Sequence, residues 1–140
     1  MLSPKKAKYR KWHVSRKSDA RLLKPETRGV TVAFGSYGLK AMTPARISSN
    51  QLEAARRALS RAAGKTAKVW TRVFPDRPRT QKAAETGMGS GKGDVQGYVV
   101  EARPGRVIIE VDGAPEAMAR EALRKAGTKL PIKGRVIARQ

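Results

Sequence analysis

The chain has 140 residues, with 31 Lys and Arg against 11 Asp and Glu, which gives a formal net charge of +20 at pH 7. This length predicts a single domain with a modest core, and so large an excess of positive charge indicates a polyanionic partner. The lack of cysteine and the single histidine argue against disulfides, zinc sites and Cys or Ser-His-Asp nucleophiles. No apolar run is long enough to span a membrane, and the first residues lack the apolar stretch of a secretory signal, so we expect a cytoplasmic protein.

Residues 1–28 are expected to form a basic arm. Residues 1–18 contain seven Lys and Arg and no acid, and aromatic side chains lie among these cations. A cationic segment without apolar periodicity is typical of a chain that orders only on its partner, and the aromatic residues suit stacking on bases. A solvated tail is the alternative. The candidate RNA contacts in the arm are Lys5, Lys6, Lys8, Arg10, Lys11, Trp12, His13 and Arg16.

Residues 29–140 are expected to form one α+β domain. Residues 30–34 predict a first strand, the Ser36-Tyr37-Gly38 segment predicts a turn, and residues 39–42 predict a second strand. Ser48 and Gln51 form a capping-box pattern, which predicts a helix that runs to Ala63 and ends at Gly64. Its apolar stripe consists of Leu52, Ala55, Leu59 and Ala62.

Three arginines of this helix lie outside the apolar stripe, with Arg57 and Arg61 on the opposite face and Arg56 beside the stripe. We expect Arg56, Arg57 and Arg61 to contact phosphate, with a simply solvated helix face as the alternative.

Further strands and a second helix follow. Residues 69–74 predict a strand whose Trp70 and Phe74 pack in the core, followed by a turn at 75–78 and an irregular stretch at 79–93. Residues 98–111 predict a hairpin around a type II turn at Pro104-Gly105. A helix is expected from Pro115 to Gly127, with an apolar stripe that includes Met118, and residues 130–137 predict a closing strand. These elements indicate two helices on one mostly antiparallel sheet.

The glycine-rich stretch Gly87–Gly93 invites comparison with a phosphate-binding loop. A Walker A loop has four residues between its first Gly and the Gly-Lys pair and then Ser or Thr; here there are three, and Gly93 takes the place of the hydroxyl residue. We therefore expect no nucleotide hydrolysis. The stretch instead suits approach of backbone N–H groups to an RNA phosphate, with a flexible linker as the alternative, and the candidate residues are Met88, Gly89, Ser90, Gly91, Lys92 and Gly93. The scattered carboxylates form no catalytic pair, so no catalytic residue, metal or cofactor is expected.

Segments along almost the whole chain resemble the bacterial and organellar large-subunit ribosomal protein sixteen family. They are MLSPK at 1–5, KYRK at 8–11, VAFGSYGL at 32–39, QLEAARRA at 51–58, VWTRVFPDRP at 69–78, ETGMGSGKG at 85–93, the Pro104-Gly105 turn and KLPIK at 129–133. The family usually has Arg where this chain has Gly87, so we expect no contact of that kind here.

This resemblance implies an α/β-hammerhead-like domain, not an enzyme, that binds 23S ribosomal RNA in the large ribosomal subunit. It implies that the protein helps to shape the aminoacyl-tRNA site near the peptidyl transferase centre. The arm and Arg56, Arg57 and Arg61 would contact ribosomal RNA, and the loop at 88–93 would lie toward transfer RNA in the aminoacyl site, or in the peptidyl site. Neighbouring ribosomal proteins are further implied partners, whereas a membrane and a small-molecule substrate are not. A general nucleic-acid-binding basic protein outside the ribosome is the alternative, on a cytoplasmic or organellar location.

Overall fold

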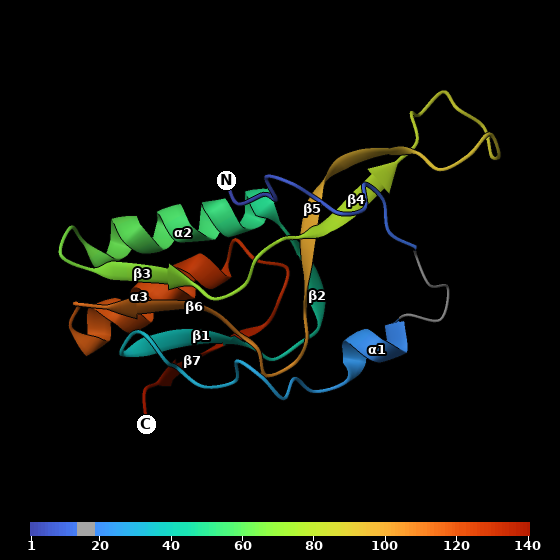
Figure 1. Ribbon diagram of the computed structural model, residues 1–140. Helices are drawn as coiled ribbons and strands as arrows, with labels where there is room; N and C mark the ends of the chain where they lie inside the picture. The colour runs from blue at the N-terminus through green and yellow to red at the C-terminus, as the bar shows by residue number, and fades with distance from the viewer. Residues whose placement is uncertain (14–18) are drawn as a thin grey trace.

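The computed structural model describes residues 1–13 and 19–140, and its core is built from two antiparallel sheets (Figure 1). The four-stranded sheet has the order β3-β6-β1-β7 and contains β1 (Tyr37–Ala41), β3 (Lys68–Thr71), β6 (Val107–Asp112) and β7 (Gly134–Ala138). The three-stranded sheet has the order β2-β5-β4 and contains β2 (Ala45–Ser48), β4 (Arg77–Gln81) and β5 (Asp94–Ala102). The helices are α1 (Asp19–Leu23), α2 (Ser49–Ala63) and α3 (Glu116–Gly127). The α+β class is confirmed, but the expected single sheet is divided into two.

Helices α2 and α3 pack against each other and on the four-stranded sheet. Ser48 caps α2 by accepting a bond from the Gln51 amide at 3.2 Å, and the Gln51 side chain accepts one from the Ser48 amide at 2.9 Å, so the predicted capping box is confirmed. Alanines on both helices face the core, which lets the two helices approach closely. The buried positions of the two helices are Leu52, Ala55, Leu59, Ala63, Ala119, Ala122, Leu123 and Ala126. Among the described residues, no helix combines the length and the apolar character needed to cross a membrane.

The predicted first strand at 30–34 is wrong, because another group takes its backbone donors. This segment has no strand partner; instead the carboxylate of Glu110 accepts bonds from the amides of Ala33 at 3.0 Å, Phe34 at 2.7 Å and Gly35 at 2.9 Å. Glu110 lies in the middle of β6 and is fully buried. A loop therefore crosses the sheet at this point, and a single carboxylate satisfies three of its N–H groups.

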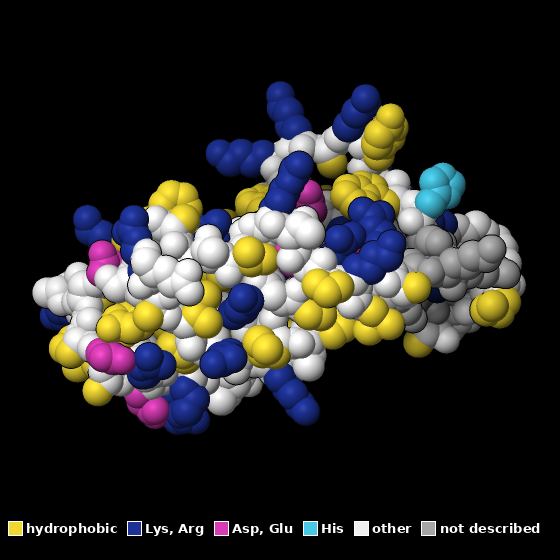
Figure 2. Space-filling view, turned by 90° about the horizontal axis from the view of Figure 1, so that it is seen from below, with side chains coloured by type: hydrophobic (Ala, Val, Ile, Leu, Met, Phe, Trp, Pro, Cys, Tyr) yellow, Lys and Arg dark blue, Asp and Glu magenta, His cyan; other side chains and the backbone are white. Residues whose placement is uncertain are grey.

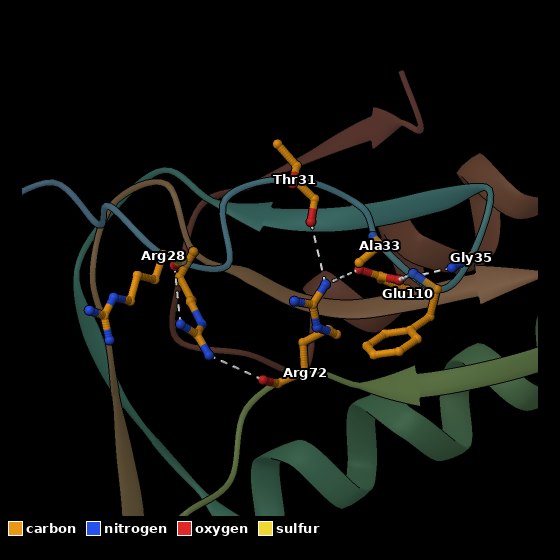
Figure 3. Close-up of polar contacts among 8 residues, drawn as sticks. Arg28, Thr31, Ala33, Gly35, Arg72 and Glu110 are labelled. Carbon is orange, nitrogen blue, oxygen red and sulfur yellow. Dashed lines mark hydrogen bonds and ion pairs between the residues drawn. The ribbon is translucent and has the colours of Figure 1, made fainter.

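Two arginines complete this cluster (Figure 3). The Arg72 guanidinium pairs with the Glu110 carboxylate and also donates to the carbonyl of Thr31 at 3.3 Å. Arg106 donates to the carbonyls of Arg28 at 3.1 Å and Arg72 at 3.3 Å. A Cβ at Gly29 would lie only 2.8 Å from the Arg106 guanidinium, so this glycine makes room for the arginine. The segment 28–35 is thus held by side chains from elements far away in the sequence.

The predicted hairpin at 98–111 is wrong in its pairing, although its turn is correct. The Arg106 amide donates to the Arg103 carbonyl at 3.1 Å, and Gly105 has a φ of 98°, as a type II turn requires. However, β5 uses its hydrogen-bonding groups on β2 and β4, whereas β6 pairs with β1 and β3. The turn therefore connects the two sheets rather than two paired strands.

Other differences concern chain segments with weak periodicity. Strand β4 lies in a region where we expected a turn at 75–78 and an irregular stretch at 79–93. It is an edge strand and includes Pro78. Strand β2 and helix α1 were not expected, and the expected turn at 36–38 belongs largely to β1. Phe74 and Met118 were predicted to face the core, but 45% of Phe74 and 46% of Met118 are exposed.

We predict that Glu110→Gln lowers the free energy of unfolding by about 3–5 kcal/mol. The amide would leave the Arg72 charge uncompensated and would turn an NH₂ group toward backbone N–H donors. Denaturant unfolding measures the change. The matched control is Glu121→Gln, which breaks an exposed 2.7 Å pair with Arg124 and should cost much less. Equal losses in the two variants would contradict the structural role of Glu110.

The same carboxylate predicts an acid-sensitive fold. Burial alone would raise the pKa of Glu110, but the bonds from Ala33, Gly35, Phe34 and Arg72 outweigh it and hold that pKa below its usual value. The stabilisation is therefore complete above the unfolded pKa of about 4.3 and is lost as the pH falls through the folded pKa. Unfolding measured at intervals from about pH 5 downward should show a weaker pH dependence for Glu110→Gln than for the unchanged protein. Parallel profiles would refute this prediction, since the other carboxylates are common to both proteins.

Candidate nucleic-acid interface

Strands β4 and β5 form a hairpin that carries the glycine-rich loop away from the rest of the protein (Figure 1). The strands pair up to Gln81 and Asp94, and the connecting residues 82–93 form the tip. Met88 is fully exposed there, and Lys92 is exposed as well. The structure thus presents residues 88–92 to solvent at the tip of the extended β4–β5 hairpin.

The glycines of this loop serve two different purposes. Gly89 and Gly91 have φ values of 96° and 88°, and Ser90 between them has a φ of 59°, so the tip needs residues that tolerate left-handed backbone. Gly93 is different, because a Cβ there would lie 2.5 Å from the backbone carbon of Gln81. A hydroxyl residue at position 93, which a nucleotide-binding loop would require, has no room beside β4.

The N-terminal arm contacts this hairpin. Residues 1–13 form neither helix nor strand, yet Lys92 donates to the carbonyl of Trp12, and Lys11 donates to the carbonyl of Lys92 at 3.2 Å. Arg10 lies 3.9 Å from Asp94, and the Arg77 guanidinium lies 5.9 Å from the centre of the Trp12 ring. The structure therefore brings residues 10–12 of the arm next to the glycine-rich loop, which lies about eighty residues further along the sequence.

The other predicted arm residues are exposed. Lys5, Lys6, Lys8 and His13 are open to solvent, with Lys8 5.4 Å from the centre of the Tyr9 ring. Arg16 lies outside the described residues. On the face shown in Figure 2, Lys and Arg side chains are spread across the protein and far outnumber Asp and Glu.

The three predicted arginines of α2 differ in their surroundings. Glu53 accepts bonds from Arg56 at 2.6 Å and from Arg57 at 3.0 Å. The hydrogen bond from Arg56, with its charge and that of Arg57, outweighs desolvation and lowers the pKa of Glu53 to about 2. Arg61, in the last turn, forms no ion pair among the described residues and shares a hollow with Lys125 and Lys129 of the α3 end. This end of α2 lies away from the glycine-rich loop, so Arg61 is not part of the surface formed by the arm and the hairpin (Figure 1).

Cations of β4 were missed by the sequence analysis. Arg77, Arg79 and Lys82 lie on or directly after β4, in a region expected to be a turn and an irregular stretch. Arg77 pairs with Glu101 at 2.9 Å and contacts Trp12, and Lys82 donates to the carbonyl of Gly89 within the loop. The alternation of cations at 77 and 79 would have indicated one face of a strand, had Pro75 and Pro78 not favoured a turn.

Comparison with known proteins gives the family. The family model described as ribosomal protein L16p/L10e matches residues 4–137. The large ribosomal subunit protein uL16 of Nitrobacter hamburgensis is 51% identical over 139 residues, and that of Afipia carboxidovorans is 50% identical over the same length. Each match covers 99% of this chain and 98% of the relative. The chain therefore belongs to the ribosomal protein L16p/L10e family, and it is a structural component of the large ribosomal subunit rather than an enzyme.

Proposed function

We propose that the arm and the β4–β5 hairpin form one continuous surface that binds 23S ribosomal RNA in the cytoplasmic ribosome. The observation that carries this proposal is the contact between the two regions, in which Lys11 and Lys92 exchange bonds with backbone carbonyls of the opposite segment. A carbonyl does not neutralise a lysine, and neither Lys11 nor Lys92 forms an ion pair among the described residues, so both can also meet a polyanion. Membership of a family of large-subunit proteins supports ribosomal RNA as the polyanion.

The glycine-rich loop is exposed and projects from the rest of the protein. It projects furthest along the hairpin, and Met88–Gly93 present an exposed apolar side chain, left-handed backbone and a lysine. We propose that these residues contact transfer RNA at the aminoacyl site, near the peptidyl transferase centre. The support is the projection of the loop together with the resemblance of this segment to the family pattern.

Arm and helix variants with equal charge changes test the RNA surface. Phosphate contacts lower the logarithm of the binding constant by ~0.7 per contact per tenfold rise in salt for single strands. Replacing Lys5 and Lys8 by Gln should therefore reduce the slope for 23S ribosomal RNA by about 1.4, and deleting residues 1–17 should reduce it by roughly 5. Filter binding between about 50 and 200 mM salt measures both slopes.

The control is the double variant Arg120→Gln and Arg124→Gln, which removes the same charge from α3. Both arginines already pair with glutamates, at 3.0 Å and 2.7 Å, so the slope should stay unchanged. An equal decrease in both double variants would show that net charge alone governs binding. An unchanged slope in the arm variants would refute contact by the arm, and equal affinity for duplex DNA would favour a general polyanion-binding protein.

A further inference from the structure

Three aromatic side chains line one open hollow on the surface of the four-stranded sheet. Phe34, Trp70 and Phe74 share a hollow of about 680 Å³ with Met1, Leu2 and part of α2. Phe34 is 56% exposed and Phe74 is 45% exposed, although both side chains are apolar. Exposed aromatic side chains that gather around one hollow are typical of a contact surface. We call Phe34, Trp70 and Phe74 the aromatic platform.

Two of the three platform rings pack against each other. Phe34 stacks on Trp70 with ring centres 6.3 Å apart and an angle of 21° between the rings, and the Arg72 guanidinium lies 5.1 Å from the Phe34 centre. The backbone amide of Phe34 is bonded to the buried Glu110, which is also the residue opposite Trp70 in the β3–β6 ladder. The buried carboxylate therefore fixes the backbone of Phe34, and the Phe34 ring packs on Trp70, so part of the ordering that a stacked ligand requires is already in place.

The rim of the hollow is positive. Glu53, which lines it, is shared by the guanidinium groups of Arg56 and Arg57. One carboxylate between two arginines leaves one excess positive charge next to the hollow; Arg56 lines the hollow, whereas Arg57 lies outside its lining. Flat, exposed aromatic faces next to a cation match a nucleotide, whose base stacks while its phosphate meets the charge.

We propose that the aromatic platform binds an unpaired nucleobase of the RNA partner by stacking on Phe34. This inference rests on the proposed RNA-binding function but concerns a separate surface and a different kind of contact. The arm supplies salt-dependent attraction, whereas the platform supplies stacking, whose strength changes little with salt. A ribosomal protein docked on the same rings is the competing occupant.

We predict that Phe34→Ala weakens binding to 23S ribosomal RNA about 5- to 150-fold, the measured range for loss of one base–aromatic stack. The salt slope should stay as in the unchanged protein. Phe34→Leu, which keeps an apolar side chain without a stacking face, should also lose most of the affinity. Phe34→Tyr keeps an aromatic ring and should retain the affinity of the unchanged protein. Met118→Ala is the control, because this α3 side chain has similar exposure and lies outside the hollow. Wild-type affinity of Phe34→Ala, or equal affinity of the Leu and Tyr variants, overturns the proposal.

Cross-linking in growing cells identifies the occupant. With Phe34→benzoylphenylalanine, irradiation should link the protein to a ribosomal RNA nucleotide, located by reverse-transcription stops. A link to a ribosomal protein, or no link to RNA, overturns the proposal. The result is separable from the arm experiment: if the Lys5 and Lys8 variant loses affinity and slope while the Phe34 variants bind normally, the RNA-binding function stands and only the platform fails.

Discussion

A single buried carboxylate fixes the loop that lies on the four-stranded sheet at residues 33–35. Glu110 has no exposed area, and an isolated charge in that position would be very costly. Three consecutive backbone amides and Arg72 surround it, so the carboxylate is fully hydrogen-bonded and the ion pair is compensated. The same bonds fix the path of the loop across β6, and through that loop they fix the exposed ring of Phe34. One buried polar cluster thus positions an apolar side chain that is exposed to solvent.

Most of the few acidic residues in this chain of charge +20 lie where they can pair with arginines. Glu53, Glu101, Glu110, Glu116 and Glu121 all pair with arginines of the folded domain. The acids therefore neutralise cations on the helices and sheets, where repulsion would oppose packing. The first thirteen residues contain no acid, and of the cations there only Arg10 has an acid within reach, at 3.9 Å. The acids of the domain thus compensate part of its positive charge, whereas the first thirteen residues have no acid of their own.

Local signals in the sequence were sufficient for some elements and not for others. The extent of α2 follows from Ser48, Gln51 and Gly64, because capping and helix termination are encoded within a few residues. The pairing of β5 with β2 and β4 could not be predicted, since neighbouring strands usually pair and nothing near Pro104 indicates that the chain changes sheets. The failed strand at 30–34 has the same origin, because its β-branched residues suit a strand but its hydrogen-bond acceptor is a glutamate 75 or more residues away.

The candidate site shows the same division. Composition alone identified the arm and the loop as cationic and glycine-rich, but it could not place Trp12 beside Lys92, because the strand that brings them together was not recognised. The folded arrangement adds a spatial order: the chain begins beside the aromatic platform, where Met1 and Leu2 line the hollow, and by Lys11 it has reached the glycine-rich loop. An RNA strand that follows the arm would therefore meet stacking rings at one end and left-handed, lysine-bearing backbone at the other. Phosphate contacts along such a path position the strand, whereas a base held at one end sets its register. The arm thus connects the aromatic platform with the glycine-rich loop, two regions that the sequence separates.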